Sequence, residues 1–179
     1  ALLDLKDSEP QAVAVARLIG STAASTRRFA FLGAGRNQGV AVGMPVRSPL
    51  GLIGRVLETG ERSARVLLIT DTESVVPVRR ASDGIPAFAT GRGDGTLQLR
   101  LINLGTNPLK VGDAFVTSGS GGLYWPGTAI AVVTRLTRDG AIARALGDPG
   151  NTEFVQVQPL WDEGAAAQQL PAPASTGAQ

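Results

Sequence analysis

Short runs of Val, Ile and Leu, separated by Gly-rich and acidic turns, repeat along most of this chain. Residues 43–80 show the pattern most clearly, with strands predicted at Leu52–Leu57, Arg65–Thr70 and Ser74–Val78. Farther on, Thr96–Asn103 alternates Leu with polar residues, which predicts a strand buried on one side. Strands this short, bounded by such turns, predict an all-β fold built as a small barrel or a sandwich.

The same pattern continues toward both ends of the chain. Further strands are predicted at Val13–Ile19, Phe29–Leu32, Pro86–Thr90, Ala114–Thr117, Thr128–Leu136, Ala141–Ala145 and Glu153–Val157. The Ser-, Thr- and Ala-rich segment Gly20–Arg28 predicts a loop or a short helix. Residues 1–12 resemble the end of a helix followed by a linker, and residues 161–179 predict a disordered tail, because Ala, Gln, Pro and Ser bury little apolar surface.

The composition removes several classes of chemistry. The chain has 179 residues, 43% of them hydrophobic, which is enough for one ordinary core or two small ones. It contains neither His nor Cys, which excludes Ser-His-Asp and Cys-His catalysis, zinc sites built from these residues, and disulfides. No catalytic residue, metal ligand or cofactor site is therefore predicted. A hydrolase that uses carboxylates stays open as the less favoured enzymatic alternative.

The charge balance is modest. The formal net charge is +2, and the densest basic pairs are Arg79-Arg80 and Arg27-Arg28. Solvated strand ends account for both pairs, whereas strong binding of phosphate or anionic lipid calls for a larger positive excess. A barrel that binds single-stranded nucleic acid is an alternative of a different class. The aromatic residues on which bases stack make up only 4% of the chain, which weighs against it.

Two polar patterns invite a catalytic interpretation. Ser118-Gly119-Ser120 resembles the nucleophile loop of trypsin-like proteases, but the chain has no His to act as the general base. Lys6 and Lys110 are the only lysines that could substitute, and a tight turn explains the glycines better. The acidic residues fall at predicted turns, where a carboxylate caps the local backbone. They are Asp71, Glu73, Asp83, Asp94, Asp113, Asp139 and Asp148.

Leu123, Tyr124 and Trp125 form the most conspicuous aromatic cluster, at a predicted corner between a loop and a strand. Amphipathic aromatic side chains in such positions commonly anchor protein interfaces. We therefore predict these three residues as a partner-binding site. The alternative is that they plug the end of a barrel.

Several segments, taken in order, resemble the family of the rod shape-determining protein MreC. They are Pro45-Val46, Gly51–Val56 (GLIGRV), Ser63–Asp71 (SARVLLITD), Val76-Pro77-Val78, Gly112-Asp113 and Val116–Gly119. The resemblance extends over roughly residues 13–160 and is to the family's extracytoplasmic β-rich part. It implies two small barrels of about six strands. We place the first at 13–65 plus 127–160 and the second at 66–126, one inserted in the other.

The resemblance also implies a function. The protein would be a non-catalytic scaffold of the bacterial cell-elongation complex, on the periplasmic side of the inner membrane. It would bind and activate the elongation-specific class B penicillin-binding protein, a transpeptidase, through an apolar surface or a strand edge. MreD, MreB and a SEDS-type glycosyltransferase are the other implied partners, together with self-association and without nucleic acid.

The start of the chain fits this resemblance. No stretch of the sequence reaches the length of about 18–20 apolar residues that spans a membrane. Ala1–Lys6 resembles the last turns of a helix cut from something upstream. We therefore expect a fragment that is anchored in the membrane only through a missing N-terminal segment, which would also carry most of a coiled coil.

Overall fold

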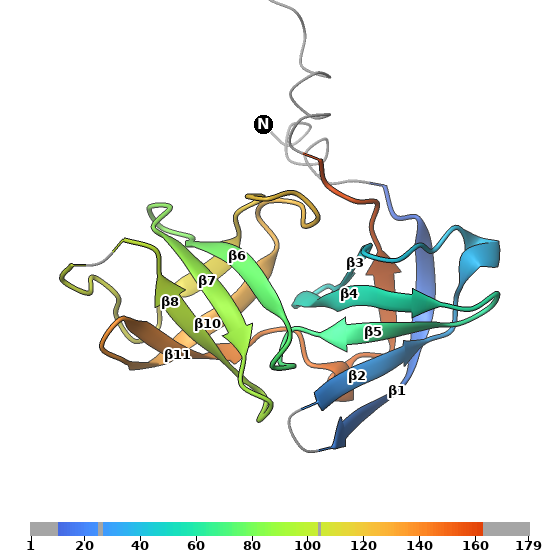
Figure 1. Cartoon of the computed structure of the whole chain (residues 1–179), viewed down its shortest axis with the longest axis horizontal. Coiled ribbons are helices and arrows are strands. Elements are labelled where there is room, and N and C mark those ends of the chain that lie inside the picture. Colours follow the sequence, from blue (N-terminus) through green and yellow to red (C-terminus); the bar gives the residue numbers. More distant parts are fainter. Residues whose placement is uncertain (1–10, 25–26, 104, 163–179) are drawn as a thin grey trace, which may run out of the picture.

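Twelve strands form two closed barrels in the computed structural model, which describes residues 11–24, 27–103 and 105–162 (Figure 1). The first barrel contains β1 (Ala14–Ala24), β2 (Arg27–Leu32), β3 (Pro45–Ser48), β4 (Gly51–Thr59), β5 (Ala64–Leu68) and β12 (Phe154–Val157). The second contains β6 (Val75–Arg80), β7 (Pro86–Gly91), β8 (Thr96–Leu101), β9 (Ala114–Thr117), β10 (Ala129–Leu136) and β11 (Gly140–Ala145). The predicted all-β fold with two six-stranded barrels is confirmed.

Helical structure is minor in the described part of the chain. It comprises two 3-10 turns, Arg36–Gln38 and Pro149–Asn151. No described helix has the length and apolar character needed to cross a membrane. The helix end predicted within 1–12, and the part of the predicted tail after Asp162, lie outside the described residues.

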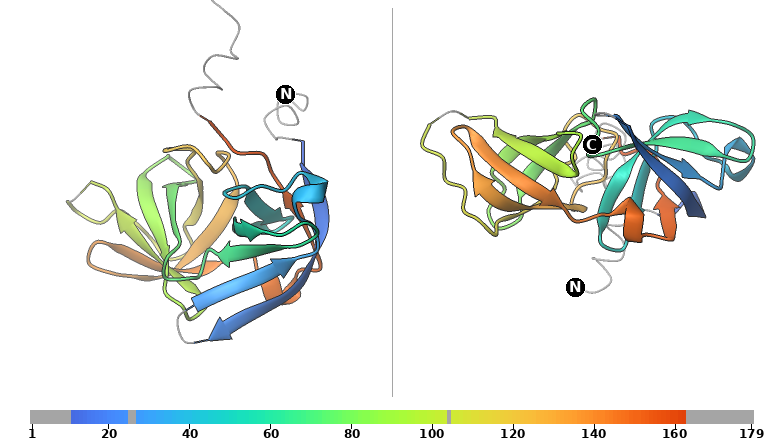
Figure 2. Two further views of the ribbon diagram at one scale, coloured as in Figure 1. Left: turned by 45° about the vertical axis from the view of Figure 1, so that its right-hand side comes forward. Right: turned by 90° about the horizontal axis from the view of Figure 1, so that it is seen from below.

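The second barrel is inserted in the first. The strand order is β1-β12-β3-β4-β5-β2 around the first barrel and β10-β11-β8-β7-β6-β9 around the second, with antiparallel neighbours throughout. The chain leaves the first barrel after β5, completes the second, and returns with β12. Figures 1 and 2 show the barrels side by side, with β12 beside β1 near the two ends of the described chain.

The expected barrel boundaries are wrong at their C-terminal part. The expected first barrel includes residues 127–160, but β10 and β11 close the second one, and only β12 returns to the first. The remaining boundary also moves, because β5 pairs with β2 and β4 in the first barrel up to Leu68. Hydrophobic alternation locates strands but carries no information on the partners with which they pair. It therefore could not assign the hairpin of β10 and β11 to a barrel.

The expected loop or short helix at Gly20–Arg28 is also wrong. β1 continues to Ala24, and its residues pair with β2 as far as the match of Ala24 with Arg27. Ser, Thr and Ala have no strong preference for a strand by themselves, and the cross-strand pairing decides their conformation. The hydrophobic pattern also misses β3, because Gly43 to Pro45 has the composition of a turn.

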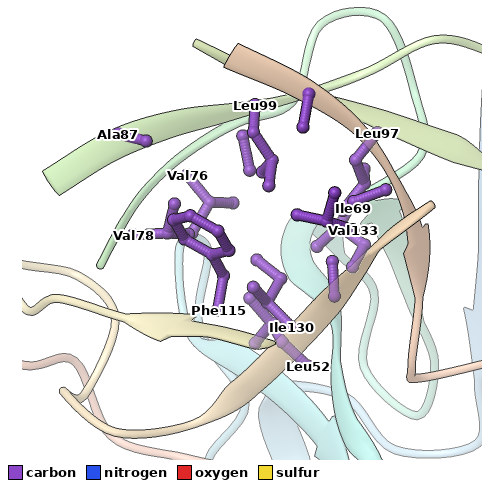
Figure 3. Packing of buried hydrophobic residues seen from close by; sticks show 14 of the residues in the cluster. Leu52, Ile69, Val76, Val78, Ala87, Leu97, Leu99, Phe115, Ile130 and Val133 are labelled. Carbon is purple, nitrogen blue, oxygen red and sulfur yellow. The ribbon is translucent and has the colours of Figure 1, made fainter. Parts of the chain in front are cut away.

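Each barrel has its own apolar core. In the first, the buried cluster includes Leu32, Val46, Ile53, Val56 and Val66. In the second, Phe115 packs against side chains from several strands of the barrel (Figure 3). The members labelled there include Val76, Val78, Leu97, Leu99, Ile130 and Val133. Alternate residues of β8 point into this core, as its Leu-polar alternation predicts.

The two cores meet at Leu52. This residue belongs to β4 of the first barrel, but its side chain lies in the core of the second, close to Ile130 (Figure 3). The backbones approach closely at the same place: a Cβ on Gly51 would lie 2.7 Å from the carbonyl oxygen of Ala129. Only glycine fits there without displacing β10. The barrels are therefore packed against each other through a close apolar contact.

A buried carboxylate strengthens this junction. Asp71 lies in the connection between the barrels and is fully buried. Its carboxylate accepts hydrogen bonds from the backbone N–H groups of Arg28, at 2.6 Å, and Glu73, at 2.8 Å. The Arg28 side chain in turn donates from Nε to the carbonyl oxygen of Gly93 in the second barrel, at 2.8 Å. One carboxylate and one arginine thus tie β2, the connection and the β7–β8 turn together.

Shortening Leu52 tests whether the barrels unfold as one unit. We expect Leu52→Ala to lower the free energy of unfolding by about 2–5 kcal/mol, since it leaves a cavity in a packed core. It should also split a single calorimetric transition into two, because the lost contact couples the barrels. Leu32→Ala, a change wholly inside the first core, serves as the matched control and should not uncouple them. If Leu52→Ala still unfolds in a single calorimetric transition, the Leu52 contact is not what couples the two barrels.

Candidate interaction surfaces

The structure separates the three predicted partner-binding residues. They lie in the corner, residues 118–126, which connects β9 to β10. Tyr124 is only 4% exposed and belongs to the core of the second barrel, which agrees with the alternative of a barrel plug. Burial raises the pKa of Tyr124 to about 12, so the phenol stays neutral at ordinary pH. Leu123 and Trp125 are half-buried, and a role for them in partner binding stays a prediction.

Leu123 and Trp125 both contact the strap, residues 158–161, which runs from β12 to the corner. Leu123 and Trp161 exchange two backbone hydrogen bonds, of 2.7 and 3.1 Å. The rings of Trp125 and Trp161 lie 4.7 Å apart between centroids, and the Trp125 indole donates to the carbonyl oxygen of Pro159 at 2.8 Å. The strap therefore connects the last strand of the first barrel to the corner of the second.

The corner is held in an unusual backbone conformation. Leu123 has a φ of 76°, the single positive value of a non-glycine residue among those described. The N–H of Tyr124 donates to the carbonyl oxygen of Gly122, which makes a γ-turn centred on Leu123. Such a backbone costs on the order of 1–3 kcal/mol and persists when neighbouring contacts hold it. The strap supplies those contacts.

A second surface lies on the outside of the first barrel. Val15, Ile19, Phe31 and Phe154, here called the first-barrel face, are between 41% and 66% exposed. β1 lies between β12 and β2, which places Phe154 and Phe31 on either side of its outward residues. Exposed large apolar side chains that gather on adjoining strands are typical of an interaction site, whereas single ones are ordinary on a soluble surface.

Ion pairs border the first-barrel face. The Arg17 guanidinium lies 5.4 Å from the Phe154 ring centroid and pairs with Glu153 at 2.9 Å. Arg65 likewise lies 4.9 Å from the ring of Phe29, and it pairs with Glu58 at 3.1 Å. Both arginines are neutralised by a neighbouring glutamate. The face is therefore apolar and aromatic, with a balanced charge at its border.

A third surface is a groove of about 410 Å³ on the outside of the second barrel. We call it the second-barrel groove. It runs over β6 and β7 beside the corner, and its lining includes Pro77, Arg79, Pro86, Phe88, Ile102 and Ser120. Phe88 and Ile102 are 41% and 48% exposed. Sequence reasoning missed both this groove and the first-barrel face, although outward-facing Phe and Ile at polar positions of strands were the available signal.

The polar patterns with a catalytic appearance have structural roles. Ser118 Oγ accepts a hydrogen bond from the N–H of Ser120, as a turn residue does. Five predicted turn carboxylates accept hydrogen bonds from nearby backbone N–H groups, which confirms their capping role: Asp71, Asp83, Asp94, Asp113 and Asp148. Among the described residues, no group of three or more acidic side chains gathers in a way that could hold a metal ion.

Arg80, at the end of β6, is hydrogen-bonded to three other residues of the second barrel. Its guanidinium donates to Asp83, at 2.7 and 3.0 Å, to Asp113, at 2.9 Å, and to the carbonyl oxygen of Pro108. The hydrogen bond from Arg80 is the main reason that the pKa of Asp83 lies below its ordinary value. Desolvation opposes the same change at Asp113, but hydrogen bonds from the Lys110 N–H and from Arg80 outweigh it and lower that pKa as well.

The lowered pKa of Asp113 predicts a stability that depends on pH. A carboxylate with a depressed folded-state pKa stabilises the fold above its unfolded pKa, here 3.8, and loses this contribution as the pH falls through the folded value. We expect Asp113→Asn to cost about 1–2 kcal/mol at pH 7 and progressively less below pH 3.8. Urea denaturation at pH 7, 5 and 3 measures this.

Asp139→Asn is the control for this prediction, because Asp139 is partly exposed and lies 3.6 Å from Arg100. Its effect should be small at every pH, since exposed ion pairs contribute little. If the loss of unfolding free energy in Asp113→Asn stayed constant between pH 7 and pH 3, the ionised form of Asp113 would not be what stabilises the fold, and the prediction would be wrong.

Comparisons with known proteins agree with this architecture. Residues 18–160 match the family model described as rod shape-determining protein MreC, barrel core. The cell shape-determining protein MreC of Caulobacter vibrioides is 33% identical over 134 residues, which cover 75% of this chain and 38% of the relative. The crystal structure of MreC from Pseudomonas aeruginosa aligns with a TM-score of 0.76 at 32% identity, over 80% of this chain and 97% of that one.

More distant structures share the fold. A complex between a penicillin-binding protein, PBP2, and MreC from Helicobacter pylori aligns with a TM-score of 0.55 at 12% identity, over 81% of this chain and 98% of that one. A structure described as the major periplasmic domain from the cell shape-determining filament MreC aligns at 0.67 and 21% identity, over 84% of this chain and 98% of that one.

The extent of these matches defines what they establish. The family match covers far more than half of the chain, whereas the chain spans only about a third of the length of the first curated relatives, 30% and 38%. MreC is a structural, shape-determining family and not a family of enzymes. With its two barrels, one inserted in the other, this chain belongs to the MreC family of rod shape-determining proteins.

Proposed function

We propose that this chain is a periplasmic scaffold of the cell-elongation complex, which binds the elongation-specific class B penicillin-binding protein and activates it. The observation that carries the proposal is a locked two-barrel body with exposed apolar surfaces, in a family where one member of the same fold is described in complex with a penicillin-binding protein. The description of a related structure as a periplasmic domain supports the proposed location.

Activation would follow from preferential binding. A scaffold shifts the transpeptidase toward an active conformation only if it binds that conformation more tightly than the inactive one. A rigid body suits this role, because little conformational entropy is lost when a preformed surface binds. The Leu52 contact and the Asp71 hydrogen bonds give this chain such rigidity between its barrels.

Leu123 and Trp125 remain our proposed contacts at the corner, with Tyr124 supporting them from within the core. MreD, MreB and a SEDS-type glycosyltransferase are further proposed partners within the same complex. The family resemblance alone supports these three, and no surface of this chain is assigned to them.

Binding to the purified periplasmic part of the transpeptidase tests the proposal. We expect saturable binding by calorimetry at moderate salt, weakened about tenfold or more in Trp125→Ala, since truncating one buried aromatic contact commonly costs at least 1.4 kcal/mol. Trp161→Ala is the matched control, because it removes the same ring contact from the strap side and leaves Trp125 in place.

The two variants separate a direct contact from an indirect one. If only Trp125→Ala weakens binding, Trp125 touches the partner. If both weaken it equally, the strap positions the corner and Trp125 acts through it. If neither does, the corner is not the contact, and an absence of wild-type binding would contradict the proposed function itself.

We further propose that two copies of this chain associate through the first-barrel face. The face is apolar at its centre and has both signs of charge at its border, in the pairs Arg17–Glu153 and Arg65–Glu58. A surface with balanced charges can meet its own two-fold copy without like-charge repulsion, as an isologous interface requires. The description of related structures as parts of a filament supports self-association.

Val15→Glu tests this second proposal, with Val111→Glu as the control. The two valines are 66% and 65% exposed, but Val111 lies in the second barrel, in the turn that precedes β9. Sedimentation velocity over a range of concentrations should show association of the wild type, weakened about tenfold or more by Val15→Glu and unchanged in the control. Equal association of all three proteins would exclude the first-barrel face as the interface between copies. A wild type that stays monomeric would contradict self-association of this fragment.

A further inference from the structure

We infer that the second-barrel groove binds an extended peptide segment of the transpeptidase partner, one that carries apolar side chains and a carboxylate. This inference rests on the proposed function for the identity of the partner. The chemistry of the segment follows from the groove itself. Its larger lining side chains are Pro77, Pro86, Phe88 and Ile102 with one arginine, Arg79, and the rest of the lining consists of small residues, two of them serines.

The arginine in the groove, Arg79, differs in its surroundings from its neighbour Arg80. Strand alternation in β6 separates the Arg79-Arg80 pair: Arg80 takes part in the network with Asp83 and Asp113, whereas Arg79 faces outward with Pro77. Among the described residues, the Arg79 side chain makes no hydrogen bond or ion pair. A half-buried guanidinium beside apolar side chains is therefore available to a carboxylate of a ligand, with which arginine forms strong bidentate contacts.

Pro77 explains why a groove exists at this place. The N–H and C=O groups of a residue in an antiparallel strand point toward the same neighbouring strand. The carbonyl oxygen of Pro77 accepts from the N–H of Ser118, so its missing N–H also faces β9. Pairing between β6 and β9 accordingly ends at the match of Val78 with Thr117, and the chain after Thr117 is free to leave the sheet and form a wall of the groove.

The opposite wall is apolar. Phe88, on β7, pairs with Pro77 across the sheet, and Ile102 follows the end of β8. Both side chains are more than two-fifths exposed and line the same cavity. A groove that runs over two neighbouring strands suits an extended segment better than a helix, because alternate side chains of an extended chain can point into it.

The first test uses a defined probe. We would titrate the labelled chain with the capped peptide acetyl-Ala-Leu-Pro-Leu-Glu-amide and follow amide chemical shifts by NMR. Shifts confined to β6, β7 and the corner, and at least several-fold weaker binding of the peptide with Lys in place of Glu, are expected. Shifts elsewhere, no shifts, or equal binding of the two peptides would overturn the assigned chemistry.

The second test uses the transpeptidase and matched variants. Phe88→Glu should weaken its binding tenfold or more, and Arg79→Gln should weaken it several-fold. Leu136→Glu and Arg135→Gln, exposed on β10 of the same barrel, are the controls and should leave binding unchanged. Circular dichroism shows whether each variant is folded.

The outcomes distinguish the two levels of the inference. If the wild type binds the transpeptidase and the Phe88→Glu and Arg79→Gln variants bind it equally well, the groove is not the binding site, while the proposed function stands. An absence of wild-type binding would overturn the proposed function together with the identity of the partner inferred here. The peptide titration decides the chemistry of the groove in either case.

Discussion

The packing of one barrel against the other is the constraint on which the rest of the structure depends. Because the second barrel is inserted between β5 and β12, two connections cross the junction, and the first barrel closes only when β12 returns to pair with β1 and β3. Leu52, on β4 of the first barrel, packs its side chain into the core of the second barrel. The backbones at Gly51 and Ala129 approach so closely that no side chain fits between them. Asp71 then satisfies two backbone donors at the point where the chain crosses.

This constraint fixes the relation between the outer surfaces. The first-barrel face and the second-barrel groove lie on different barrels, so that their relative orientation is determined by the junction and by the strap from β12 to the corner. Hydrogen bonds between Leu123 and Trp161 add a second point of attachment, remote in sequence from Leu52. A body held at two places can present two surfaces to different molecules in a constant geometry, which is a physical requirement of a scaffold.

Much of the fold could be predicted from the sequence because strands leave a local signal. The Leu-polar alternation of Thr96–Asn103 predicts β8, and the absence of His and Cys excludes most nucleophilic catalysis on composition alone. The assignment of β10 and β11 to a barrel could not be predicted, because it depends on pairing with β9 and β8 and not on the hairpin itself. Pairing across such distances has no signature in a single strand.

The candidate sites show the same limit at the level of single residues. Trp125 and Tyr124 stand out in the sequence as adjacent aromatics, but adjacency in a strand or turn sends neighbours to different sides, and Tyr124 lies in the core. Arg79 and Arg80 form an equally uniform pair in the sequence, yet one is saturated by carboxylates and the other faces the groove. What distinguishes such neighbours is the environment that tertiary structure brings to each, which composition cannot show.

Closure of the barrels decides how this chain can bind a partner. Both sheets are closed, so no described strand is left as an edge strand along its whole length, where another strand is most readily added. Of the two modes that the sequence left open, an apolar surface or a strand edge, closure of the barrels therefore favours contact through outward side chains. Apolar side chains on the outer faces contribute nothing to the two cores, so they lower solubility without a benefit to folding. The first-barrel face and the second-barrel groove hold six of the twelve exposed large hydrophobic side chains of the described chain, which is why we propose these two surfaces for partner binding.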